Sequence, residues 1–129
     1  MTRAEQETKD HRIALVIEDQ PEVRDLAAAI LEESDLTVAE ASSAEEALTF
    51  LDEHGPEVAM MFVDVKLPGR MDGVDLARIA AASWPWIKVV LTSGAMEHSL
   101  NDLPGSTTFM AKPWRALDVL VEAERAVAA

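Results

Sequence analysis

Polar side chains that could do chemistry follow four short apolar segments, each at the point where the segment ends. They are Glu18 and Asp19 after residues 13–17, Asp64 after 58–63, Thr92 after 87–91, and Lys112 after 107–111. If these ends lie together, three carboxylates, a hydroxyl and an ammonium group share one site. Such a set suits a divalent cation, which prefers oxygen ligands, and a phosphoryl group, which can use a carboxylate nucleophile and nearby positive charge.

The apolar segments are predicted to be β-strands. Residues 58–63 are apolar throughout, which is typical of a strand buried on both faces. Shorter apolar runs predict strands at 13–17, 87–91 and 107–111, and the alternating segment 36–41 predicts an edge strand.

Helical patterns lie between and after these strands. Helices are predicted from Pro21, from Ser43 to the stop at Gly55, over 74–83, over 95–106 and from about Trp114. The apolar stripe of the first helix comprises Val23, Leu26, Ala27, Ile30 and Leu31, and that of the last comprises Leu117, Leu120, Val121 and Val127. The 95–106 segment is the weakest helix, because it has few apolar anchors and ends in Pro104-Gly105.

Alternating strands and helices predict an α/β fold, a parallel sheet covered by helices on both faces. With the strand order 2-1-3-4-5, the first and third strands are neighbours where the winding direction reverses. Ligands of such doubly wound sheets bind outside the carboxyl ends of the strands at that point. The second strand, which lacks a comparable polar residue, then lies outside the site.

The electrostatics of the expected site require positive charge. Three carboxylates at short range repel one another, and burial adds to the cost of keeping them ionised. Lys112 supplies one positive charge. We expect a hard divalent cation, Mg²⁺ or Mn²⁺, to supply the rest.

In order and spacing, these residues resemble a response-regulator receiver domain of two-component signalling, from about Ile13 to Ala126. The matching features are Glu18-Asp19, Asp64 with Pro68, Met71-Asp-Gly73, Thr92, Phe109 and Lys112-Pro113. The resemblance implies the flavodoxin-like (βα)5 fold, with one domain over residues 13–129. Residues 1–12 are expected to be a disordered polar leader, and no output domain is expected.

The resemblance also implies a role for each matching residue. Asp64 would be the phosphoacceptor, and Lys112 and Thr92 would bind the phosphoryl oxygens. Metal ligands would be Asp19, Asp64 and the backbone carbonyl of Lys66, with Glu18 acting mainly through water. Thr92 and Phe109 would form the switch, and the Lys112–Pro113 peptide bond would be cis.

The function implied is that of a stand-alone switch and not of a turnover enzyme. A histidine kinase or histidine phosphotransfer protein would phosphorylate Asp64. The added charge would then alter a protein-binding surface made by the 95–106 helix, the strand before Lys112 and the last helix, or the phosphoryl group would pass along a relay. The downstream target is not identified by the sequence, and a monomer or weak homodimer is expected.

Composition limits the partners and the compartment. The net charge of −13 disfavours nucleic acid and anionic membranes, and no apolar run is long enough to span a bilayer. The chain has no cysteine, which excludes disulfides and thiolate catalysis and fits a cytoplasmic protein.

Three alternative functions remain open. A Mg²⁺-dependent phosphohydrolase could use Asp64 as its nucleophile, although the second acid that dehalogenase-type enzymes want two residues later is replaced by Lys66. A flavodoxin-like cofactor protein would need a phosphate loop where Glu18-Asp-Gln-Pro21 would repel FMN. The third is a receiver that binds its partner without phosphorylation.

Four features depart from the family pattern or carry no assigned role. Glu18 replaces the commoner aspartate, and Gly69-Arg70 lengthen the loop after Asp64 by one residue, with Arg70 expected in solvent. The weak 95–106 segment is predicted to be ordered or displaced on activation. Each of the three tryptophans, at positions 84, 86 and 114, is predicted to be half-buried at a helix end.

Overall fold

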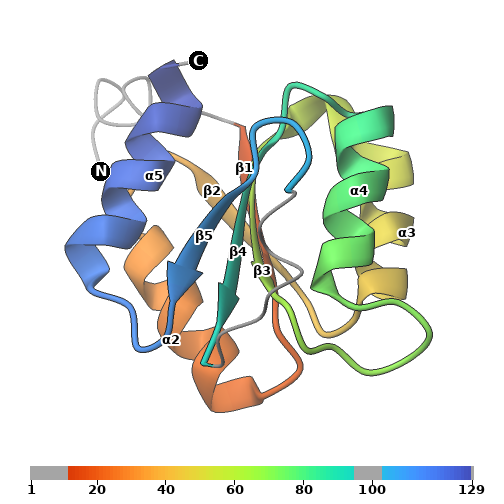
Figure 1. The fold of residues 1–129 in the computed structure, drawn as a ribbon. Coiled ribbons are helices and arrows are strands. Elements are labelled where there is room, and N and C mark those ends of the chain that lie inside the picture. Colours follow the sequence, from red (N-terminus) through yellow and green to blue (C-terminus); the bar gives the residue numbers. More distant parts are fainter. Residues whose placement is uncertain (1–11, 95–102, 129) are drawn as a thin grey trace.

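The protein is described by a computed structural model that covers residues 12–94 and 103–128. Its centre is one parallel sheet with the strand order β2-β1-β3-β4-β5 (Figure 1). The strands are β1 Ile13–Ile17, β2 Thr37–Ala41, β3 Val58–Asp64, β4 Lys88–Ser93 and β5 Thr108–Ala111. The predicted fold class and strand order are confirmed.

Four α-helices within the described residues cover the two faces of the sheet. They are α2 Pro21–Leu31, α3 Ala44–His54, α4 Gly73–Ser83 and α5 Ala116–Ala128, with a short 3₁₀ turn, η1, at Gly55–Glu57. Helices α3 and α4 lie on one face, and α2 and α5 lie on the other (Figure 1). No helix of the described segments is both long and apolar enough to cross a bilayer.

Strand β3 is buried along its whole length because it lies in the middle of the sheet. Its side chains alternate between the two layers. Met61 and Val63 join the core under α3 and α4, and Met60 and Phe62 join the core under α2 and α5. This alternation places Asp64 at the end of the strand on the Phe62 side.

The predicted inward face of the last helix was partly wrong. Leu117 is 71% exposed, and the buried residues of α5 are Val119, Glu122, Ala123 and Ala126. A charged residue therefore lies on the buried face, because Lys88 pairs with Glu122 at 3.3 Å. The apolar pattern assumed that a glutamate faces water, so it missed Glu122 and placed Leu117 inward, whereas Val127, also predicted inward, packs against the core.

Two other expectations need correction or lie outside the described chain. Leu26, assigned to the inward stripe of the first helix, is 56% exposed. Of the predicted 95–106 helix, residues 95–102 lie outside the described residues. Residues 103–106 are not helical, and Gly105 adopts a φ of +54° in a turn there.

Candidate functional site

The acidic residues meet at the carboxyl edge of the sheet. One oxygen from each of Glu18, Asp19 and Asp64 lies within 4.8 Å of the other two. The sheet brings them together because β1 and β3 are hydrogen-bonded neighbours, with Ile17 opposite Val63. We call these three residues the acidic cluster.

Glu18 is the most enclosed member of the acidic cluster, with 4% exposure. Its Oε1 lies 2.9 Å from Lys112 Nζ, and its Oε2 accepts a hydrogen bond from the Gln20 backbone N–H at 3.1 Å. A direct contact with the lysine therefore occupies one oxygen, and the implied role of Glu18 toward a metal through water stays a prediction.

Asp64 is 7% exposed and is held from two sides. Its Oδ2 lies 3.4 Å from Lys112 Nζ, and its Oδ1 accepts a long hydrogen bond of 3.3 Å from the Lys66 backbone N–H. Lys112 thus bridges Glu18, which follows β1, and Asp64 at the end of the neighbouring strand β3.

The charges of the cluster alter two pKa values. Desolvation raises the pKa of Asp19, and a hydrogen bond and the negative charge of Glu18 raise it further. Burial acts to lower the pKa of Lys112, but hydrogen bonds to Glu18 and Asp64 and their negative charges outweigh it, so the net pKa is raised. Lys112 therefore stays protonated, and the cluster favours additional positive charge.

Gly73 allows α4 to begin directly against the phosphoacceptor candidate. A Cβ at this position would lie 2.2 Å from the Asp64 backbone carbonyl oxygen, which is closer than atoms can approach. The Gly73 backbone N–H donates to the Val65 carbonyl at 2.8 Å. A capping box between Asp72 and Asp75 then fixes the start of the helix.

The lengthened loop is tied to α3 and not to the site. Gly69 has a φ of +91°, and the Arg70 backbone N–H donates to Glu45 Oε2 at 3.1 Å. Arg70 is exposed and does not line the cavity at the acidic cluster, in agreement with its predicted position in solvent.

A cavity of about 500 Å³ opens at the acidic cluster. Its lining residues are Asp19, Gln20, Asp64, Lys66, Ser93, Gly94 and Lys112. Two carboxylates and two lysines in one lining suit a phosphoryl group held with a hard cation. The oxygen donor set of the acidic cluster fits Mg²⁺ or Mn²⁺.

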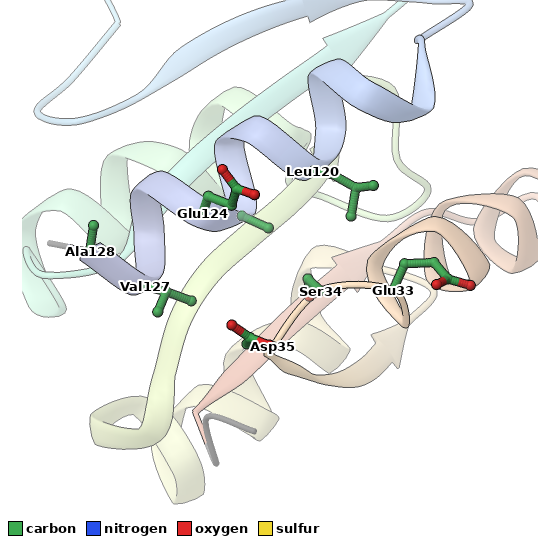
Figure 2. Close-up of a pocket in the computed structure, with 8 residues that line it drawn as sticks. Glu33, Ser34, Asp35, Leu120, Glu124, Val127 and Ala128 are labelled. Atoms are coloured by element: carbon green, nitrogen blue, oxygen red, sulfur yellow. The ribbon is translucent and has the colours of Figure 1, made fainter. Parts of the chain in front are cut away.

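A second cavity, of about 270 Å³, lies between α5 and the turn that follows α2 (Figure 2). Leu120, Glu124 and Val127 line it from α5, and Glu33 and Asp35 line it from the other side. None of the predicted site residues lines this cavity. This cavity is therefore not part of the predicted site.

Thr92 and Trp114 are joined by a hydrogen bond beside the acidic cluster. Thr92 is 2% exposed and is the register partner of Asp64. Its Oγ1 accepts a hydrogen bond of 2.7 Å from the Trp114 indole N–H. The indole ring packs edge-on against Phe62, with ring centroids 5.1 Å apart.

Comparison with known proteins decides the family. The family model for the response regulator receiver domain matches residues 14–123. The chain belongs to the response-regulator receiver family. The resemblance read from the sequence is therefore confirmed.

Two curated relatives of this receiver domain are longer proteins, and only a part of each matches it. It is 32% identical to the nitrogen assimilation regulatory protein NtrX of Azorhizobium caulinodans, over 88% of this chain and 25% of that protein. It is 33% identical to the transcriptional regulatory protein PdtaR of Mycobacterium tuberculosis, over 90% of this chain and 57% of that protein. The chain thus spans a quarter to somewhat over half the length of these relatives.

Solved receiver domains share its fold. The receiver domain of NtrX from Brucella abortus superposes with a TM-score of 0.78 at 30% identity, covering 90% of this chain and 98% of that one. A receiver domain protein from Clostridium thermocellum gives a TM-score of 0.81 at 23% identity, covering 91% and 94% of the two chains.

Thr92 and Phe109, the residues predicted to form the switch, lie on different faces of the sheet. Phe109 is opposite Leu91 in the register and packs, half-buried, against the core under α3 and α4. Thr92 is opposite Met110, which packs against the other core. The role of Thr92 and Phe109 as a switch stays a prediction. The Lys112–Pro113 peptide bond is cis.

Sequence reasoning missed the contact that Trp114 makes. The residue is half-buried near the start of α5, but its N–H reaches the candidate switch hydroxyl. The signal that could have found it is an indole donor directly after Lys112-Pro113, a segment already assigned to the site. A search for helical periodicity of apolar residues does not detect a single hydrogen-bond donor in a loop.

Proposed function

We propose that this receiver domain accepts a phosphoryl group on Asp64 from a phosphohistidine of a histidine kinase or histidine phosphotransfer protein. The observation that carries the proposal is the bridge of Lys112 between Asp64 and Glu18, next to an open cavity. It combines a nucleophilic carboxylate with a fixed positive charge that can receive phosphoryl oxygens.

In the proposed reaction, an Asp64 carboxylate oxygen attacks phosphorus and a P–O bond forms. The P–N bond to the donor imidazole breaks, and the imidazole nitrogen keeps the electron pair and takes a proton from solvent. The product is an acyl phosphate on Asp64. Lys112 Nζ, 3.4 Å from Oδ2, can pair with the transferred oxygens, and loss of the group to water would be slow.

We propose Mg²⁺ as the metal, held by Glu18, Asp19 and Asp64 together with the Lys66 carbonyl that the family resemblance implies. Bound there, the cation neutralises the carboxylates and the phosphoryl oxygens. The residues of the chain do the remaining work. Gly73 sets the backbone of Asp64, and Lys112 holds Asp64 against Glu18.

An apolar groove beside the site fits the histidine-bearing partner. It has a volume of about 300 Å³ and is lined by Val23, Leu26, Lys112, Pro113 and Trp114. Because Lys112 also lines the acidic cavity, a protein seated on the groove is positioned next to Asp64. Leu26, the most exposed side chain of α2 in its apolar stripe, would be its anchor.

Intact mass spectrometry tests the proposal. Incubation with acetyl phosphate or phosphoramidate and Mg²⁺ is expected to add one labile phosphoryl group to the wild type. Asp64→Asn, and wild type without Mg²⁺, are expected to gain none. A gain of equal size in Asp64→Asn would contradict the assignment. Continuous release of phosphate without a trapped adduct would indicate a phosphohydrolase instead.

A second variant separates the groove from the chemistry. Leu26→Asp is expected to be phosphorylated by acetyl phosphate like the wild type, but to lose phosphotransfer from a histidine-bearing partner. Equal loss with both donors would show that the substitution damages the site and would contradict the docking assignment. If the wild type itself is phosphorylated by no donor, a cognate kinase included, the protein is instead a phosphorylation-independent interaction module.

A further inference from the structure

The hydrogen bond between Trp114 and Thr92 connects the proposed phosphorylation site to the surface. Thr92 lies directly opposite Asp64 in the pairing of β3 with β4. A phosphoryl group on Asp64 would therefore be within reach of the Thr92 side chain. Among the hydrogen bonds of the described residues, however, the partner of Thr92 Oγ1 is the Trp114 indole N–H at 2.7 Å. The hydroxyl is thus held toward Trp114.

We propose that Trp114 is a positioning residue that holds Thr92 in the unphosphorylated conformation. This inference rests on the function proposed above. A threonine side chain occupies discrete staggered rotamers, so turning its hydroxyl toward a phosphoryl oxygen moves Oγ1 in one step away from the indole. The 2.7 Å hydrogen bond is then broken, and its loss opposes phosphorylation.

Loss of the same hydrogen bond also affects the position of the Trp114 ring at the protein surface. The indole is a donor only, so once Thr92 turns away its N–H needs another acceptor or water. Trp114 is half-buried between Phe62 and the apolar groove that also contains Val23 and Leu26. A shift of the ring therefore alters the wall of that groove. Phosphorylation of Asp64 therefore changes the protein surface on the α2 side, on the sheet face opposite Phe109.

The indole ¹⁵N–¹H resonance of Trp114 gives a direct test. The resonance is assigned by its absence in Trp114→Phe, which keeps an aromatic ring but lacks the donor. In the wild type it is expected to shift when beryllofluoride, a phosphoryl mimic, is added with Mg²⁺. In Thr92→Val, which lacks the acceptor, it is expected to be shifted without the mimic. An unchanged Trp114 resonance in either experiment would overturn the proposal.

Affinity for the mimic gives a second test. Trp114→Phe is expected to bind beryllofluoride with Mg²⁺ about fivefold more tightly than the wild type, because no hydrogen bond has to be broken. Trp86→Phe is the matched control: it removes an indole hydrogen bond to the Gly55 carbonyl, remote from Thr92, and is expected to bind like the wild type. Equal or weaker binding by Trp114→Phe would overturn the proposal.

The two proposals can fail separately. If the wild type binds the mimic and Asp64→Asn does not, the proposed function stands, and the Trp114 resonance and the affinity of Trp114→Phe decide the inference. The response of the wild-type resonance to the mimic needs a variant only for its assignment. If wild type and Asp64→Asn behave alike with mimic and acetyl phosphate, the proposed function falls, and the role of Trp114 falls with it.

Discussion

Two buried glutamates lie near opposite edges of the sheet and serve different purposes. Glu18 follows β1 at the carboxyl edge and is 4% exposed, whereas Glu122 in α5 is 7% exposed and contacts Lys88 at the start of β4. Each is paired with a lysine, at 2.9 Å for Glu18 and 3.3 Å for Glu122. Burial and an ion pair are therefore common to both.

The surrounding charges distinguish them. Around Glu18 there are three carboxylates, and Lys112 forms ion pairs with two of them, Glu18 and Asp64. Around Glu122, one carboxylate is shared by Lys88 and Arg125. The first arrangement has more carboxylates than ion-paired lysines next to an open cavity, and in the second the carboxylate is paired with two cations within the fold. Excess charge beside a cavity marks the site, whereas a buried ion pair alone does not.

Exchanging each lysine for methionine gives the sharpest version of this comparison. Lys112→Met is expected to slow phosphorylation by acetyl phosphate about 100- to 1,000-fold, because it removes the fixed positive charge that stabilises the transferred oxygens. A mass-spectrometric time course measures the rate. Lys88→Met is the matched control and is expected to keep the wild-type rate. Equal slowing in both variants would contradict the distinction.

Lys88→Met is expected to act on stability instead. Removal of one partner leaves Glu122 buried with only Arg125, at 3.4 Å, so the free energy of unfolding is expected to fall by about 2–3 kcal/mol. Urea denaturation measures the change. A second substitution, Glu122→Leu, is expected to restore most of the loss. Failure of that rescue would show that Lys88 stabilises the fold by some other contact.

A pair of glycines tests how closely the backbone around the site is fixed. Gly73→Ala places a Cβ against the Asp64 carbonyl and is expected to lower the free energy of unfolding by about 2 kcal/mol and to slow phosphorylation. Gly94→Ala is the control for stability alone, because a Cβ there has no atom within 4 Å, although Gly94 lines the cavity at the acidic cluster. Denaturation is measured for both variants, and the phosphorylation time course is measured for Gly73→Ala against the wild type. An equal loss of stability in the two variants would contradict the role of Gly73.

The sequence predicted the parts of this molecule in which pattern and packing agree. The run 58–63 between a turn and a carboxylate indicated a central strand, and its end at Asp64 placed the site. The face of α5 was assigned partly wrongly, because Glu122 is buried by a contact with Lys88 from a distant strand. The contact of Glu18 with Lys112 at 2.9 Å could not be predicted either, since only the folded chain brings the two residues together. Contacts between side chains that are far apart in sequence produce no periodic pattern in the sequence, so the pattern does not predict them.

The smallest expected effect concerns Asp19, the exposed member of the acidic cluster. Desolvation and the neighbouring Glu18 raise its pKa, so the folded state binds the proton more tightly than the unfolded state does. Its ionisation therefore costs stability: the cost is absent below the unfolded pKa, develops as pH rises through the raised folded pKa, and is complete above it.

In EDTA, Asp19→Asn is expected to be slightly more stable than the wild type at neutral pH, and the difference is expected to vanish in acid. Added Mg²⁺ should reverse the order, because the wild type gains a bound cation that the variant binds less well. Urea denaturation at several pH values, with and without Mg²⁺, measures both effects. A variant less stable in EDTA at neutral pH would show that Asp19 is held by favourable contacts and not by repulsion, and the comparison with Glu122 would then lose its electrostatic basis.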